Sequence, residues 1–168
     1  MFIILLAPIF GALWIWLAKK KLNPNTVIKF GLGFIFLGLG YYVLFGTRFF
    51  ADAAGITSLD FFTLALLVIT FGELCLSPIG LSIMTKLSTQ NLQGMMMGMW
   101  FLASAYGQYV AGIIGSNMSD SVVEGGSNLD KLLAYTNGYK EIALYSIIAG
   151  LFLIIISPLV RKLMQEVK

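Results

Sequence analysis

The sequence predicts an all-α, polytopic membrane protein with five transmembrane helices. Hydrophobic residues make up 58% of the 168 residues and charged residues only 11%, and the mean hydropathy is +0.88. Soluble domains carry about 25% charged residues. The apolar residues gather in five runs, most of them near the ~20 residues that span a bilayer. No polar stretch is long enough to fold as a soluble domain, so we expect a single membrane unit, residues 1–168.

The first expected span covers residues 2–18 and is followed by Lys19, Lys20 and Lys21. A secretory signal has its positive charge before the apolar run, so a cleaved signal peptide is not expected. After a turn rich in asparagine and proline, the second span covers residues 27–45. It contains four glycines that are suited to close helix packing, at positions 31, 33, 38 and 40.

The remaining expected spans cover residues 59–85, 94–115 and 142–160. The polar stretch 116–141 is interpreted as an outside loop with one short surface helix. In the fourth span, Gly107 and Gly115 belong to a row of small residues that is suited to a helix contact.

The basic residues predict the orientation, because cytoplasmic loops carry an excess of lysine and arginine. With the N-terminus outside and the C-terminus in the cytoplasm of a bacterial-type inner membrane, the charge count is eight inside against three outside. The inside residues are Lys19, Lys20, Lys21, Lys29, Lys86, Arg161, Lys162 and Lys168, and the outside residues are Arg48, Lys131 and Lys140. Basic residues at the ends of apolar runs do not form a nucleic-acid-binding patch, so no nucleic acid partner is expected.

Glu73, near the middle of the third span, is the strongest candidate for a functional residue. A carboxylate in hydrocarbon costs on the order of 3 kcal/mol. Burial favours its neutral form and a cationic partner its charged form, so it is suited to a proton or substrate path. The alternative is a structural carboxyl that only joins neighbouring helices by hydrogen bonds.

The residues after Glu73 support a working site. Ser77 lies four positions on, so its hydroxyl projects from the same helix face. Pro78 has no backbone N–H to bond to the previous turn, so we expect the helix to bend there. Gly72 and Gly80 flank the site and leave room for a close neighbour.

In the fourth span, Trp100, Ser104 and Gln108 follow one another at intervals of four and share one stripe of the helix. A polar stripe on a membrane helix is expected to face the protein interior or a water-filled cavity. The methionines at 95–97 are interpreted as adaptable packing rather than soft metal ligands. The chain has no histidine and a single cysteine, Cys75, which we interpret as buried packing, so no metal site is expected.

These residues resemble the proton-dependent oligopeptide transporters of the major facilitator superfamily. The match is strongest over residues 72–82 (GELCLSPIGLS), continues through 85–87 (TKL) and resumes at 96–102 (MMGMWFL). These stretches are similar to the family's tenth and eleventh membrane helices. Residues 2–10 (FIILLAPIF) look like the eighth helix, and residues 157–159 (SPL) with the basic tail look like the twelfth.

The resemblance implies a partial major facilitator carboxy-terminal bundle and a proton-coupled transporter of di- and tripeptides. It implies that Glu73 helps to bind the peptide's amino terminus and takes part in proton coupling, that Ser77 lies nearby, and that Trp100 lines the central cavity. The proton is then the coupling ion, and no other cofactor is implied.

Five helices correspond to the family's helices eight to twelve, so we expect a carboxy-terminal fragment whose partner is the missing amino-terminal half. The alternative is a small stand-alone membrane protein that acts as a partner or assembly subunit without transport of its own. An enzyme is not expected, because the sequence shows neither a nucleophile and base pair nor a set of metal ligands.

Overall fold

The computed structural model describes residues 2–52, 54–86, 88–120 and 127–163. Within these residues the chain forms five α-helices and two short 3₁₀ helices, which confirms the predicted all-α fold with five long helices. The α-helices are α1 (Phe2–Lys19), α2 (Thr26–Gly46), α3 (Leu59–Lys86), α4 (Gln93–Asp120) and α5 (Asn128–Leu163), and the 3₁₀ helices are η1 (Thr47–Phe49) and η2 (Gln90–Leu92).

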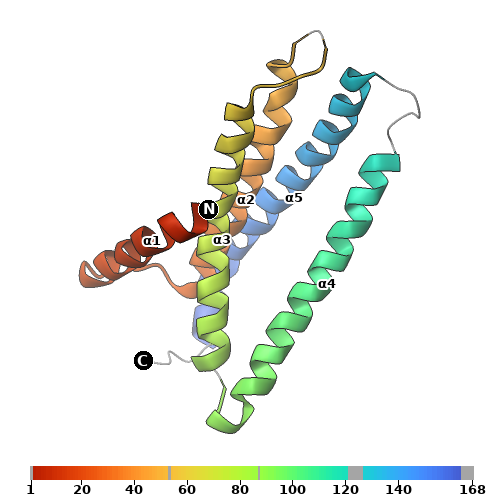
Figure 1. Ribbon diagram of the computed structural model, residues 1–168. Coiled ribbons are helices and arrows are strands. Elements are labelled where there is room, and N and C mark those ends of the chain that lie inside the picture. The colour runs from red at the N-terminus through yellow and green to blue at the C-terminus, as the bar shows by residue number, and fades with distance from the viewer. Residues whose placement is uncertain (1, 53, 87, 121–126, 164–168) are drawn as a thin grey trace.

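The centre of the fold is a group of three helices, α2, α3 and α5, in which α2 packs along both of the others (Figure 1). On one side of α2, Gly31 and Gly38 meet α5. A Cβ built at Gly31 would lie 2.8 Å from the carbonyl oxygen of Gly150, and one at Gly38 would lie 2.9 Å from that of Ala143. Only glycine allows backbones to approach this closely, so this row fixes the α2–α5 distance.

The second row of glycines on α2 meets α3 in the same way. A Cβ at Gly33 would lie 3.1 Å from the carbonyl oxygen of Gly72, and one at Gly40 would lie 3.2 Å from that of Ala65. Each row repeats after seven residues, about two helical turns, which keeps its members on one face. The close packing predicted for these glycines is confirmed.

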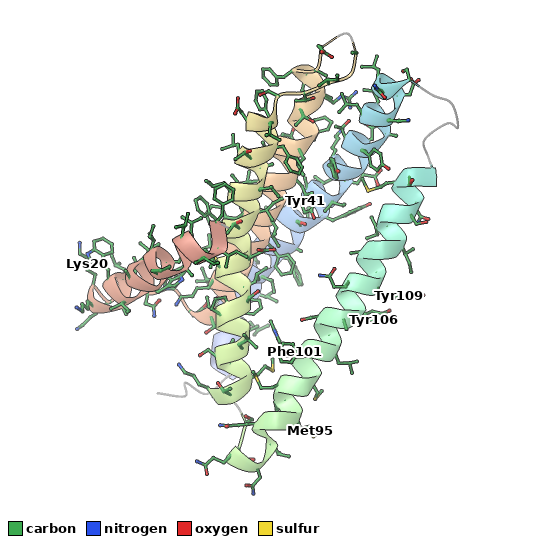
Figure 2. The ribbon with its side chains drawn as sticks, in the orientation of Figure 1. Lys20, Tyr41, Met95, Phe101, Tyr106 and Tyr109 are labelled. Atoms are coloured by element: carbon green, nitrogen blue, oxygen red, sulfur yellow. The ribbon has the colours of Figure 1, made fainter. Side chains whose placement is uncertain are left out.

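Side-chain hydrogen bonds join α2 to α5 at both ends of the pair. At one end the Nδ2 of Asn25, the N-cap residue of α2, donates to the Ser157 hydroxyl at 2.6 Å, and that hydroxyl lies 3.0 Å from the Asn25 Oδ1. At the other end Arg48 donates to the Asn137 Oδ1 at 2.9 Å. Between them, the ring of Tyr41 lies 6.1 Å from that of Tyr139 of α5 (Figure 2 labels Tyr41).

The Asn25–Ser157 pair gives a testable expectation for stability. Ser157 is 1% exposed, so Ser157→Ala leaves the Asn25 amide without its buried partner. We expect the free energy of unfolding to fall by about 1–3 kcal/mol. Detergent-solubilised protein titrated with denaturant and followed by circular dichroism measures the change. Ser104→Ala, at an exposed hydroxyl, is the control and should change stability by less than about 0.5 kcal/mol.

The two remaining long helices diverge from this group (Figure 1). The ring of Phe10 on α1 lies 5.4 Å from that of Phe71 on α3, and the Lys29 ammonium lies 4.3 Å from the centre of the Trp14 ring. Helix α4 runs apart from the others over much of its length. No described atom lies within 4 Å of the Cβ positions of Gly107 and Gly115, so the predicted helix contact of this row is not made within the described chain.

The predicted loop over residues 116–141 was wrong in extent. Helix α4 continues to Asp120 and α5 begins at Asn128, while residues 121–126 lie outside the described part of the chain. The cause is a capping box: the backbone N–H of Ser127 donates to the Asp130 carboxylate at 2.9 Å, and that of Asp130 to the Ser127 hydroxyl at 3.3 Å. This reciprocal pair satisfies amides that the first turn leaves without helical partners, and so starts a helix in a polar stretch.

Four helices in the described residues are long and apolar enough to cross a membrane. They are α1, α2 with η1, α3, and α5 up to Val160. Helix α4 is 28 residues long but is not among the four. It includes the polar Ser104 and Gln108, which are better suited to a protein or water environment than to lipid.

Candidate functional site

The candidate site lies on one face of α3. Glu73, Ser77 and Gly80 follow at intervals of four and three residues, so they form a single stripe along the helix. Glu73 and Ser77 are exposed, whereas Gly80 is buried. The stripe therefore offers a carboxylate and a hydroxyl at one end and is covered at the other.

The residue that covers Gly80 is Trp100 of α4. A Cβ built at Gly80 would overlap the outer end of the indole's six-membered ring, where Cη2 is the nearest atom and Cζ2 and Cζ3 both lie at 2.6 Å. Trp100 comes twenty residues later in the sequence, yet it lies on the face that carries Glu73 and Ser77. The space for a close neighbour predicted at Gly80 is thus filled by Trp100, which is also a predicted site residue.

The back of the site is held by packing on the other sides of α3. Gly72 contacts α2, where a Cβ would lie 2.7 Å from the Gly33 carbonyl oxygen. Phe71 packs between two rings, with centroids 5.4 Å from Phe10 and 6.0 Å from Phe36. Cys75 is 1% exposed, as the packing interpretation predicted. These contacts fix the rotation of α3 and so direct Glu73 away from α2.

Pro78 lies within α3, which continues as a helix to Lys86. Its missing N–H deprives the previous turn of one backbone hydrogen bond, which commonly kinks a helix. The bend at Pro78 stays a prediction. Beyond it, the Gln93 side-chain amide donates to the Thr85 carbonyl oxygen at 3.4 Å, which joins the end of α3 to the start of α4.

Ser104 and Gln108 continue the stripe from Trp100 along α4 and are exposed. The Ser104 hydroxyl donates to the Trp100 carbonyl oxygen at 3.0 Å, a bond within its own helix. Figure 2 labels the exposed Phe101, Tyr106 and Tyr109 on this same helix. A cavity-facing position for Ser104 and Gln108 stays a prediction.

In the part of the chain that the structure describes, no three His, Cys, Asp or Glu residues gather in one place. Met95, the first of the three consecutive methionines, is 65% exposed (Figure 2). Its side chain is therefore largely outside the packing that the sequence led us to expect. Met96 and Met97 are partly buried.

The arrangement is suited to binding a cation with an apolar extension. A carboxylate in a low-dielectric setting pairs with an ammonium group, and a hydroxyl one turn away can accept or donate a further hydrogen bond. An indole face supports either a cation or an apolar side chain. Sequence reasoning identified these three groups but missed that Gly80 holds the indole, because no local pattern indicates a contact across twenty positions.

Comparisons with known proteins find a matching family and similar sequences. The sequence model described as "PTR2: POT family" matches residues 1–131. A peptide transporter, YePEPT, of Yersinia enterocolitica is 34% identical over 169 residues, which cover 99% of this chain and 31% of the relative. A di-/tripeptide transporter of Lactococcus lactis is 33% identical over 168 residues, which cover 100% of this chain and 31% of the relative.

Two solved structures share the fold. A crystal structure of the peptide transporter POT in complex with alafosfalin is 27% identical with a TM-score of 0.71. The match covers 98% of this chain and 31% of the chain in that structure. The structure of a POT family transporter in complex with a thioalcohol-conjugated peptide is 28% identical with a TM-score of 0.75. The match covers 94% of this chain and 29% of the chain in that structure. The chain spans about a third of the length of these relatives.

Proposed function

The chain belongs to the POT family, and we propose that it forms the carboxy-terminal part of a proton-coupled transporter of di- and tripeptides. The observation that carries the proposal is the single face of α3 on which Glu73, Ser77 and the Trp100 indole lie together. The relatives named as peptide transporters match over nearly the whole of this chain. No covalent chemistry is involved, because substrate and proton only cross the membrane.

In this proposal Glu73 binds the ammonium group of the peptide and also carries the coupling proton. When Glu73 is ionised, the pair with the ammonium is attractive. When Glu73 takes up a proton, the attraction is lost and the peptide is released more readily. Ser77 and Trp100 contact the rest of the peptide, and Ser104 and Gln108 face the same aqueous path from α4.

The proposed orientation places the N-terminus outside and the C-terminus in the cytoplasm of the plasma membrane. The Arg48–Asn137 hydrogen bond and the cation–π contact of Lys140 with Phe45 bring two of the outside-assigned residues, Arg48 and Lys140, to the same end of the α2–α5 pair. The lysines at 19–21, assigned to the inside, lie at the end of α1 and just after it, and so precede the opposite end of α2. This arrangement supports the positive-inside assignment.

A two-part uptake assay tests the function. We expect liposomes that hold this chain joined to the amino-terminal half and seventh helix of a POT relative to take up labelled dialanine when a proton gradient is imposed. A protonophore, which collapses the gradient, should abolish accumulation. A cavity with alternating access is built between two helical bundles, so the chain alone should show no uptake.

The remaining outcomes separate the alternatives. Uptake by the chain alone would mean that five helices suffice, through a homo-oligomer. Failure of the joined form, in protein shown to be folded and inserted, would contradict peptide transport and favour a small membrane protein that acts only as a partner or assembly subunit.

A further inference from the structure

The contact between Gly80 and Trp100 differs from the glycine contacts among α2, α3 and α5, each of which includes a backbone atom of the neighbouring helix. At Gly72 and Gly150, an added Cβ would meet backbone oxygens at 2.7 Å, so only a shift of whole helices could relieve the clash. At Gly80 the nearest atoms all belong to the six-membered ring of Trp100. That ring is the end of a rotatable side chain and can move without moving either backbone.

The distance along α3 between Glu73 and Gly80 corresponds to the length of a short peptide. Seven residues of α-helix rise by about 10 Å. An extended chain spans about 3.3–3.6 Å per residue, so a dipeptide reaches about 7 Å and a tripeptide about 10–11 Å. A peptide whose ammonium group lies at Glu73, and which runs along this stripe, therefore reaches the level of Gly80 only with its third residue.

We propose that Gly80 is a positioning residue that seats the Trp100 indole where it contacts the third residue of a bound tripeptide, a role that rests on the function proposed above. The missing side chain at position 80 lets the indole lie flat on α3, in line with Glu73 and Ser77. The contact sets the preference for tripeptides over dipeptides, whereas Glu73 sets the affinity for the ammonium group that both share.

Gly80→Ala is the direct test, and its first readout is the environment of the indole. Trp14→Phe and Trp16→Phe leave Trp100 as the chain's one tryptophan. In this background Gly80→Ala should shift the fluorescence emission to longer wavelength, because the indole leaves its contact with α3. The matched control is Gly138→Ala, where the added Cβ would press on the Met118 side chain, with Cγ and Sδ at 2.8 Å, at another contact of α4. The control should leave the emission unchanged.

The second readout is the ratio of affinities for trialanine and dialanine, measured in the joined form used for uptake. Gly80→Ala should weaken trialanine binding at least threefold more than dialanine binding. Trp100→Leu, which keeps Gly80 and removes the ring, should lower the ratio in the same direction. Glu73→Gln should weaken both peptides by a similar factor and leave the ratio unchanged.

The outcomes are distinguishable. Unchanged emission in the Gly80→Ala protein, or equal loss of affinity for both peptides, would overturn the positioning role and leave peptide transport in place. If the unsubstituted joined form bound neither peptide, the proposed function and this role would both be contradicted.

Discussion

Gly150→Ala is expected to destabilise the protein, although alanine is a better helix former than glycine. The new methyl group would lie 2.7 Å from the Gly31 carbonyl oxygen and 3.1 Å from the Ile35 amide nitrogen. Both are backbone atoms of α2, so α5 must move outward and lose the close packing along the row. We expect the free energy of unfolding to fall by about 1–3 kcal/mol, the usual cost of overpacking.

A control substitution at Gly46 is expected to change the free energy of unfolding in the opposite direction. Gly46, at the end of α2, has helical φ and ψ of −62° and −22°, and no described atom lies within 4 Å of its Cβ position. Gly46→Ala should therefore raise stability by about 0.5–1 kcal/mol through helix propensity alone. Unfolding in mixed detergent micelles, followed by circular dichroism, measures both. Changes of the same sign would contradict the assignment of Gly150 to a close backbone contact.

The glycines also show how far sequence can predict this fold. Small residues on one helix face predicted close packing both on α2 and on α4. The structure confirms the first, at Gly31 and Gly33, whereas Gly107 and Gly115 have open space around them. Whether a row of small residues packs against another helix depends on where the other helices lie, and the residues of the row do not determine that.

Two further differences have identifiable physical causes. Helix α5 begins earlier than the predicted residue 142 because the capping pair of Ser127 and Asp130 starts a helix in a polar stretch that hydropathy does not mark. The candidate site was predicted as residues on two separate helices. Their meeting at Gly80 depends on the turn that the Gln93–Thr85 hydrogen bond helps to close, which local periodicity does not specify.

Glu73→Gln in the joined form is expected to abolish the proton dependence of peptide uptake. The glutamine side chain does not take up a proton at the pH values of an uptake assay, so peptide binding should no longer respond to pH. In the unsubstituted protein, peptide affinity should fall as the pH is lowered, because protonation of Glu73 removes its attraction for the ammonium group. The lost charge-assisted hydrogen bond contributes about 1.5–3 kcal/mol, which is about tenfold or more in affinity.

The same substitution separates the two readings of Glu73. Glutamine keeps the size and hydrogen-bonding capacity of the side chain, so a carboxyl that only joins helices would be replaced with little effect. Dialanine binding and gradient-driven uptake, each measured across pH, are the readouts, and Glu141→Gln, at an exposed carboxylate of α5, is the matched control. Unchanged binding and uptake at every pH would reduce Glu73 to a structural residue. A flat pH response with weakened binding, seen only at position 73, would place both the proton and the peptide ammonium on this carboxylate.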